Sequence, residues 1–328
     1  MTIATRSILK IASGLLVLAV INAGSAYAQA NYPSRPVRII APTSPGSGSD
    51  IIARLLAQGL SERLGRQVIV ENRAGAGTMI GGDLVAKSTP DGHTLLMGVS
   101  TLAINPSTYK KVPYDAIRDF APITQAVFAS NIMVIHPSLP VRTVKEFIAF
   151  AQMRPKEVIY ASAGFGTNPH LATELFANMA KIRMTHVPYQ GDAPSIVDLI
   201  GGHVAMTVSP VPRSLPHVRG GRLKALGVTS ANRVPAAPEI PTIAEAGLPG
   251  YEAVQWYGLL APAGTPKDII ARLHKESVAI LRSTEGRDKL TDVYVEVVAN
   301  TPEQFASFIK SETTKWAQVA KEVGIVAE

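Results

Sequence analysis

Few residues of this sequence have a type and spacing that could support catalysis or metal binding. His170 and Glu174 are four positions apart, the spacing that places two metal ligands on one face of a helix. The remaining histidines form no recognisable partner set, so a helix-start histidine that points into a cleft or caps a neighbour is favoured. Ser47 or Ser162 could form a hydrolase with His170, but neither serine lies in a GxSxG motif. We therefore predict no metal site and no catalytic residue, with an exported serine-type hydrolase as the alternative function.

A glycine-rich stretch from Gly75 to Gly81 invites comparison with a dinucleotide-binding loop. Its spacing is GxGxxxG, whereas the dinucleotide fingerprint is GxGxxG, and no acid follows about 20 residues later at a strand end. The N-terminal residues, described below, predict an exported protein, and such a protein has little access to NAD. We interpret the stretch as a strand–helix turn and predict no cofactor.

The composition narrows the possible sites and partners. The chain contains no cysteine, so it has no disulfide, no thiolate nucleophile and no cysteine-ligated zinc. Its 32 Lys and Arg residues outnumber its 25 Asp and Glu residues. These basic residues are spread along the chain, with Lys110 and Lys111 the only adjacent pair after residue 28, which predicts a solvated surface and no nucleic-acid partner. A mildly positive protein weakly favours small anionic ligands.

The first 28 residues have the pattern of a signal peptide. Arg6 and Lys10 precede a short apolar run, and Ala26-Tyr27-Ala28 places small residues at the two positions that a signal peptidase reads. The apolar run is shorter than the roughly 20 residues that cross a bilayer. We predict that residues 1–28 are cleaved after Ala28, which leaves a soluble periplasmic chain of about 300 residues.

Strands and helices alternate along the rest of the chain. The apolar segment 37–42 predicts a strand, and apolar residues at helical spacing from Ile51 to Leu60 predict the helix after it. Further strands are predicted at 67–72 and 93–100. This alternation predicts an α/β fold with mostly parallel sheets and helices on both faces.

The strand–helix register starts afresh at about Ile132 and closes with a strand near 224–230. A proline-rich segment from Pro235 to Pro249 then indicates a crossover between domains. Each crossing would act as a hinge when the two lobes close. We predict two lobes, with residues 29–130 and 250–328 in lobe 1 and residues 131–249 in lobe 2.

Short loops of glycine, serine and proline follow several predicted strands. "SPGSGSD" follows the first strand, "NRAGAGTMIGG" the second, "VSTLAIN" the third, and "SAGFGTNPH" a lobe 2 strand that ends at Ser162. Open α/β sheets bind ligands at the carboxyl ends of their strands. Backbone N–H groups in such turns and at helix N-termini are unpaired donors with a partial positive charge. The loops therefore predict a site that binds an anion with its backbone and catalyses no reaction.

Longer segments of the chain carry a resemblance to a known family. They include "PGSGSDIIARLLAQGLSERLG", "VIVENRAGAGTMIGGDLVAKSTPDGHTLLMG", "YASAGFGTNPHLATELF" and "HVPYQGDAPSIVDLIGGHV". With shorter matches they run in order through nearly the whole chain after residue 28. The chain resembles the Bug-type substrate-binding receptors of tripartite tricarboxylate transporters, which are extracytoplasmic two-lobed proteins of the type II periplasmic-binding class.

The resemblance implies a binding protein without catalysis. A small organic carboxylate would be held between the lobes by main-chain amides, hydroxyls and ordered waters. The protein would act as a monomer that delivers this ligand to the membrane permease subunits of a tripartite tricarboxylate transporter. The resemblance implies the following ligand-binding residues: Gly46, Ser47, Gly48, Ser49, Asp50, Gly77, Thr78, Ser100, Thr101, Ser162, Gly164, Gly166, Thr167, His170, Tyr189 and Gly191.

Two positions depart from the commonest pattern of this family. Ser47 stands where the family usually has a second glycine after proline, which narrows the backbone's freedom and adds a hydroxyl. Ser209-Pro210-Val211 stands where many members place an acid or an amide. An amino-acid ligand needs an acid opposite its ammonium group, so this departure counts against an amino acid without excluding one. Separately, Trp256 and Tyr257 are interpreted as core or hinge packing.

Overall fold

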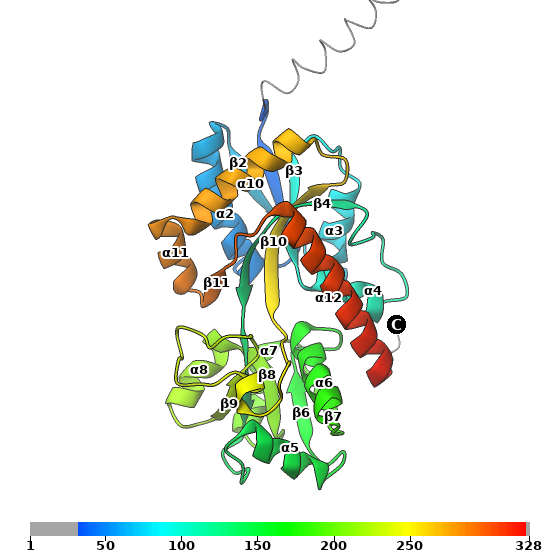
Figure 1. The fold of residues 1–328 in the computed structure, drawn as a ribbon, viewed down its shortest axis with the longest axis vertical. Helices are drawn as coiled ribbons and strands as arrows, with labels where there is room; N and C mark the ends of the chain where they lie inside the picture. The colour runs from blue at the N-terminus through cyan, green and yellow to red at the C-terminus, as the bar shows by residue number, and fades with distance from the viewer. Residues whose placement is uncertain (1–31, 326–328) are drawn as a thin grey trace, which may run out of the picture.

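The computed structural model describes residues 32–325 (Figure 1). Its strands form a six-stranded sheet and a five-stranded sheet, with helices packed around both. The predicted signal peptide, residues 1–28, lies outside the described residues and stays a prediction. Within the described part of the chain, no helix has the length and apolar character needed to cross a bilayer.

The first sheet has the strand order β11-β4-β10-β3-β1-β2. β1 pairs in parallel with both β2 and β3, because α2 and α3 carry the chain back across the sheet between them. β10 runs antiparallel to both of its neighbours, and β11 runs antiparallel to β4. The strands are β1 (Val37–Ala41), β2 (Val68–Asn72), β3 (Thr94–Val99), β4 (Phe120–Ala129), β10 (Gln255–Pro262) and β11 (Val295–Val297).

Helix α2 (Gly48–Leu64) shows how the sequence sets an element of this lobe. Ile52, Leu56 and Leu60 recur every four residues and are fully buried, on the face that packs against the first sheet. Gly65 ends the helix with a left-handed φ of 67°. The other helices around this sheet are the short 3-10 helix η1 (Ala76–Thr78), α3 (Met79–Ala86), α4 (Thr101–Thr108), α10 (Lys267–Arg282), α11 (Thr284–Thr291) and α12 (Pro302–Val323).

The second sheet has the strand order β7-β6-β8-β5-β9. β6 pairs in parallel with β7 and β8, while β5 runs antiparallel to β8 and β9. Its strands are β5 (Asn131–Ile135), β6 (Ile159–Ser162), β7 (Thr185–Pro188), β8 (Met206–Pro210) and β9 (Lys224–Val228). Its helices are α5 (Val144–Gln152), α6 (Asn168–Ala180), α7 (Asp192–Ile200), α8 (Val211–Arg219) and α9 (Ile243–Ala246).

The chain passes between the two sheets twice. β4 leads through Ser130 directly into β5, and the return enters β10 at Gln255. β4 and β10 pair antiparallel over their length and run along the molecule toward the second sheet (Figure 1). The predicted two-lobed α/β fold is confirmed with one correction, since both sheets are mixed where mostly parallel sheets were expected. Strand–helix alternation predicts parallel neighbours, but β5 and β10 each enter their sheet from the other lobe and run antiparallel to both of their neighbours.

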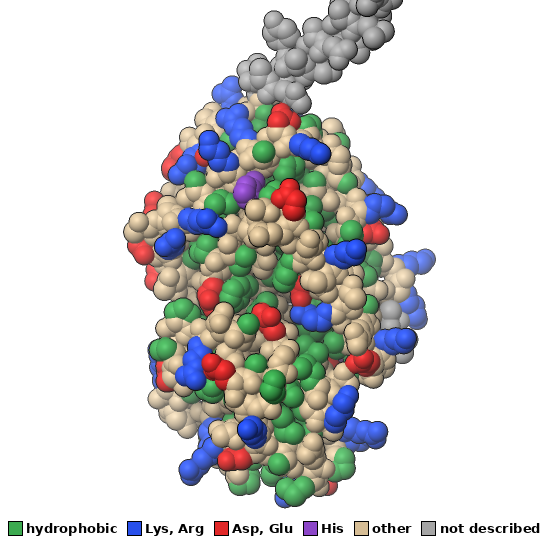
Figure 2. Space-filling view, in the orientation of Figure 1, with side chains coloured by type: hydrophobic (Ala, Val, Ile, Leu, Met, Phe, Trp, Pro, Cys, Tyr) green, Lys and Arg blue, Asp and Glu red, His purple; other side chains and the backbone are tan. Residues whose placement is uncertain are grey.

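The long C-terminal helix α12 contacts elements of both sheets. It lies along α4 of the first lobe and reaches α6 of the second (Figure 1). At its far end the Asn178 side-chain amide donates a hydrogen bond to the Glu322 carboxylate. One apolar cluster continues from Trp256 and Phe305 to Phe176, so the two lobes share buried surface on the α12 side. Figure 2 shows charged side chains of both signs scattered over one face of the molecule.

Candidate ligand-binding site

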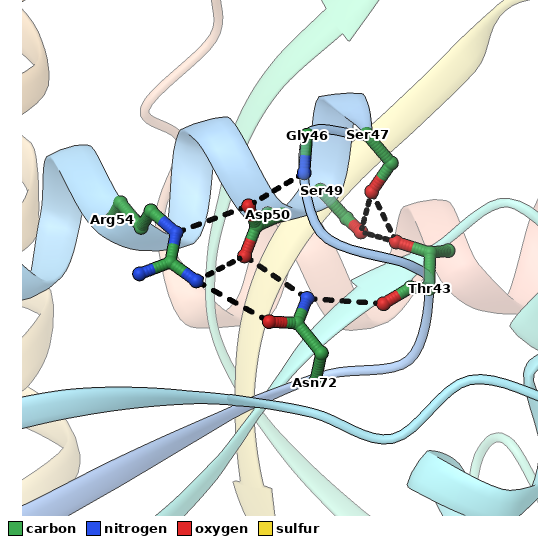
Figure 3. Close-up of polar contacts among 7 residues, drawn as sticks. All are labelled: Thr43, Gly46, Ser47, Ser49, Asp50, Arg54 and Asn72. Atoms are coloured by element: carbon green, nitrogen blue, oxygen red, sulfur yellow. Dashed lines mark hydrogen bonds and ion pairs between the residues drawn. The ribbon is translucent and has the colours of Figure 1, made fainter.

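The loop between β1 and α2 brings three hydroxyl groups together (Figure 3). The Thr43 hydroxyl contacts those of Ser47 and Ser49, and Ser49 is almost fully buried. Ser47 stands at the N-cap of α2, yet its side chain caps none of the backbone amides there. The first turn of this 17-residue helix therefore keeps amide donors and the positive end of the helix dipole for another partner.

Asp50 holds this loop in place (Figure 3). Its Oδ2 accepts hydrogen bonds from the Gly46 amide at 2.9 Å and from Arg54 Nε at 3.0 Å. Its Oδ1 accepts from Asn72 Nδ2 at 3.0 Å and pairs with Arg54 at 3.0 Å. Burial acts to raise the pKa of the Asp50 carboxyl, but the hydrogen bonds from Arg54, Gly46 and Asn72 outweigh it and hold that pKa below its usual value. The Asp50 carboxylate and the Gly46 amide are thus hydrogen-bonded to each other, and the other partners of Asp50 belong to the same lobe.

Gly48 lies directly against the hydroxyl of Tyr257. A Cβ atom at position 48 would stand 2.5 Å from the Tyr257 hydroxyl oxygen, so only glycine lets the start of α2 approach β10 this closely. Tyr257 was expected to serve in packing, and the structure places its hydroxyl at this loop. Burial, followed by the charge of Asp192, raises the pKa of Tyr257 to about 12.

The second and third predicted loops of lobe 1 meet each other. The hydroxyls of Thr78 and Thr101 are 2.6 Å apart, which joins η1 to the start of α4. Gly77 has φ of 60° and its carbonyl accepts a hydrogen bond from the Asn105 side chain at 2.9 Å. Ser100 is fully buried and donates to the Gln255 side-chain oxygen at 2.7 Å. This last bond connects the third loop to the return crossing.

In lobe 2, the predicted loop after β6 is closed by its own hydrogen bonds. The Thr167 hydroxyl donates to the Gly164 carbonyl at 2.7 Å, and the Gly164 amide donates to the Ser162 hydroxyl at 3.1 Å. The Gly166 amide donates to Nδ1 of His170 at 3.1 Å. Gly164 and Gly166 have φ values of 132° and 70°, in the region that favours glycine. The loop conformation therefore depends on a neutral His170, because a protonated Nδ1 cannot accept this bond.

His170 belongs to a buried stack of aromatic rings beneath that loop. The rings of His170 and His186 are parallel with centroids 4.0 Å apart, and Tyr160 stacks on His186 at 4.8 Å. Burial lowers the pKa of His170 to about 3, helped by His186, and lowers the pKa of His186 to about 4. Tyr160 donates its hydroxyl hydrogen to Glu174, whose pKa is raised by burial. Both histidines are consequently neutral near pH 7.

Tyr189 and Gly191 take different positions at the end of β7. The Tyr189 hydroxyl donates to Asp198 on α7 at 2.6 Å, and the Tyr189 side chain packs on the apolar cluster beneath that helix. Gly191, with φ of 107°, donates its amide to the Ala163 carbonyl at 3.1 Å and immediately precedes α7. The Tyr189 hydroxyl is therefore bonded within its own lobe. The Gly191 amide connects the start of α7 to the loop after β6.

A cavity of about 210 Å³ lies between the lobes and is called here the inter-lobe cavity. Its walls come from both crossings, from the loop after β6, from the starts of α6 and α7, and from the end of β8. None of the sixteen predicted residues is among its lining residues in the described chain, but their immediate neighbours are. The lining includes Ala163, Asn168, Asp192, Pro210, Gln255 and Tyr257.

Three polar side chains of this cavity have free hydrogen-bonding capacity among the described residues. Gln255 uses its oxygen to accept from Ser100, which leaves its NH₂ group available as a donor. The Tyr257 hydroxyl has no hydrogen-bond partner in the described chain. Oδ1 of Asp192 is buried and also has no partner among these residues. Asp192 directly follows Gly191, a predicted binding residue. This adjacency is the one feature of the sequence that indicates Asp192 as a site residue.

The geometry does not assemble a hydrolase from Ser162 and His170. Ser162 contacts Nε2 of His186 at 2.7 Å, while His170 Nδ1 is used by the Gly166 amide. Ser162 is fully buried, which leaves no path for a substrate carbonyl to reach its hydroxyl. His170 and Glu174 stand 4.0 Å apart, but in the described chain no third His, Cys, Asp or Glu joins them to form a metal site.

Comparison with known proteins identifies the family. The model of the "Tripartite tricarboxylate transporter family receptor" matches residues 52–325. Protein BugT of Bordetella pertussis is 38% identical over 295 residues, which cover 89% of this chain and 90% of BugT. The structure of R. palustris Rpa4515 with adipate is 36% identical, with a TM-score of 0.77, over 90% of this chain and 100% of that one. MatC from Rhodopseudomonas palustris with bound malate is 30% identical, with a TM-score of 0.73, over 88% of this chain and 100% of that one. The predicted Bug-type resemblance is confirmed, and the chain belongs to the tripartite tricarboxylate transporter receptor family.

Proposed function

We propose that this protein is a periplasmic receptor that captures a small organic carboxylate between its two lobes. The observation that carries the proposal is the inter-lobe cavity, where Gln255 and Tyr257 of the return crossing present unused donors. The starts of α6 and α7 reach the same cavity, and helix N-termini favour negative charge. Solved relatives with adipate and with malate support a carboxylate as the ligand.

The predicted binding residues divide into two roles in this proposal. Some of these residues use their polar groups within their own lobe, and their role is to position the loops. Asp50 holds the first loop, and His170 holds the loop after β6. The amides of the first turn of α2, at Gly48 and Ser49, contribute donors from lobe 1 beside Tyr257. The Ala163 amide contributes from lobe 2, since Ala163 lines the cavity.

Closure of the lobes would complete this donor set. We place lobe 1 at residues 29–130 and 250–328 and lobe 2 at residues 131–249, with the hinge in the two crossings. A ligand that contacts both lobes binds the closed form more tightly than the open form, and that difference drives closure. The closed monomer would then deliver the ligand to the membrane permease subunits of a tripartite tricarboxylate transporter, after export and cleavage behind Ala28.

A binding protein differs from an enzyme in what happens to its ligand. Titration calorimetry against mono-, di- and tricarboxylates, amino acids and aromatic acids should reveal one site per chain for at least one of these acids. Unfolding temperature should rise with ligand concentration, because the ligand binds the folded state. NMR of the ligand after prolonged incubation should show it unchanged. Absence of binding across the panel would overturn the receptor, and conversion of the ligand would favour the hydrolase.

A further inference from the structure

Asp192 is the only charged side chain among the described residues that line the inter-lobe cavity. It is the first residue of α7, directly after Gly191. Its Oδ1 atom is buried and accepts no hydrogen bond from any described residue. A buried carboxylate oxygen without a partner carries a desolvation cost that a ligand group can remove. Asp192 therefore lines the cavity and has a carboxylate oxygen that no described residue uses.

The charges around Asp192 show that the protein only partly compensates for its burial. Burial raises the pKa of the Asp192 carboxyl, and the positive charge of Arg213 on α8 acts in the opposite direction. Arg213 is exposed and forms no ion pair with Asp192 in the described structure. The negative charge of Asp192 also contributes to the raised pKa of Tyr257. The Asp192 carboxylate and the Tyr257 hydroxyl are therefore close enough for a single ligand to contact both.

A second observation concerns the wall formed by the end of β8. The family resemblance implies an acid or an amide near this position in many members, and the chain has Ser209-Pro210-Val211 there instead. Pro210 and Asp192 line the same cavity. The cavity thus has an acid on α7 although the end of β8 provides none, so the sequence-based argument against an amino-acid ligand no longer applies.

The electrostatics of the cavity also discriminate between ligands. A ligand with negative charges alone would be repelled by an ionised Asp192, or would have to bind with that carboxyl protonated. A ligand that carries both a carboxylate and a cationic nitrogen can place its carboxylate toward the helix N-termini and amide donors. Its nitrogen can then occupy the free Oδ1 of Asp192 as a charge-assisted hydrogen bond.

We propose that Asp192 is a specificity-determining residue and that the ligand is a zwitterionic carboxylate whose ammonium group binds the Asp192 carboxylate. This inference rests on the proposed receptor function and narrows its substrate class. A hydroxy acid offers only a neutral donor to the same oxygen, so it should bind less tightly than the matching amino acid.

The test compares ligands that share a carbon skeleton and differ only at the nitrogen. Aspartate is titrated against malate and succinate, and glutamate against glutarate, by calorimetry at pH 7.5. In the wild type, the amino acid of at least one set should bind tenfold or more tightly than its nitrogen-free partner. In the isosteric Asp192→Asn variant this ratio should fall to about one. Asp198→Asn is the matched control on the same helix, since Asp198 faces the Tyr189 hydroxyl and does not line the cavity.

The outcomes separate this inference from the receptor proposal. Succinate or glutarate binding as tightly as the amino acid in the wild type would overturn the role of Asp192 while leaving a carboxylate receptor in place. An amino-acid preference that survives Asp192→Asn would do the same. Failure of every carboxylate in the wider panel to bind would overturn the receptor and this inference together. Thermal unfolding of both variants without ligand checks that each is folded.

Discussion

A Cβ atom on Gly48 would lie 2.5 Å from the Tyr257 hydroxyl oxygen, so the first residue of α2 and the return crossing are in direct contact. This contact joins two parts of the chain that are more than 200 positions apart. Tyr257 also lines the inter-lobe cavity, and β10 continues from there into the first sheet. The start of α2 is therefore held against the strand that carries the chain back from the second lobe.

Gly48→Ala should destabilise the protein through this contact. The new methyl group overlaps the Tyr257 hydroxyl, and overpacking of this kind costs about 1–3 kcal/mol of unfolding free energy. In a Tyr257→Phe background the nearest remaining atom would be the ring carbon at 3.0 Å, so the same substitution should cost less. Urea unfolding of the four proteins of this cycle measures the coupling. Equal costs of Gly48→Ala in both backgrounds would show that the contact is not the cause.

Asp50→Asn should loosen the first loop. The amide keeps one acceptor oxygen and turns an NH₂ group toward the donors of Gly46, Arg54 or Asn72. We expect a loss of about 1.5–3 kcal/mol in unfolding free energy, the range for hydrogen bonds to a charged group. Glu285→Gln, which breaks the exposed ion pair with Lys289, is the control and should change stability by less than about 1 kcal/mol. Equal losses in the two variants would remove Asp50 from its positioning role.

The pH dependence of that loss has a defined sign. The folded-state pKa of Asp50 is lowered from 3.8, so its stabilisation is complete above about pH 4 and is lost as the pH falls through the folded value. The stability difference between the wild type and Asp50→Asn should therefore be constant from pH 7 to about pH 5 and shrink below pH 3.8. Urea unfolding at a series of pH values measures this difference. A difference that grows toward low pH would contradict the assigned hydrogen bonds.

The stacked histidines should make the protein less stable in mild acid. Their pKa values of about 3 and about 4 lie below the ordinary 6.5, so the unfolded chain binds protons that the folded chain does not as the pH falls from 6.5. Their stabilisation is complete above pH 6.5 and is lost toward pH 4. Glu174 has a raised pKa and acts in the opposite sense near the lower end of this range. His186→Gln should reduce the slope of unfolding free energy against pH, between pH 6.5 and 5, by about one proton. An unchanged slope would show that His186 is protonated in the folded protein.

Thr167→Val should weaken ligand binding by releasing the loop after β6. The Thr167 hydroxyl donates to the Gly164 carbonyl, so its removal also costs about 0.5–1.5 kcal/mol of stability without ligand. Thr173→Val is a matched control on the same helix, because it removes a hydroxyl-to-carbonyl bond with Pro169 at 2.9 Å. Both variants should lose similar stability, and only Thr167→Val should lose affinity by about tenfold. A similar affinity loss in both variants would assign the effect to α6 as a whole.

The sequence predicts most of the elements near the cavity because their signals are local. Glycine and serine after a strand, followed by apolar residues at helical spacing, are enough to predict the start of α2. β4 was missed, since Pro122 and Gln125 interrupt the apolar pattern that indicates a strand. Its direction follows from its pairing with β10, a contact across more than 100 positions that no local pattern encodes.

The roles of individual site residues were harder to predict because they depend on which hydrogen bonds are already made. Asp50 and Ser47 have the right chemistry to meet a ligand, but the Asp50 carboxylate finds its partners within its own lobe. Tyr257 follows Trp256 in an apolar strand, which suggests a packing role. Only the close approach of Gly48 in the folded structure places the Tyr257 hydroxyl at the loop. Asp192 lies one position beyond a predicted residue. That its Oδ1 is buried without a hydrogen-bond partner depends on the folded structure, and no local sequence pattern indicates it.

Affinity of the Tyr257→Phe variant is the most direct test of a carboxylate site between the lobes. The Tyr257 hydroxyl has no hydrogen-bond partner among the described residues, so its removal costs the unliganded protein no bond. Titration calorimetry with the tightest-binding acid of the panel should show one site in both proteins, with affinity roughly tenfold or more lower in the variant. Unfolding without ligand should be nearly unchanged. Equal affinity in the wild type and Tyr257→Phe would contradict a ligand held in the inter-lobe cavity against the return crossing.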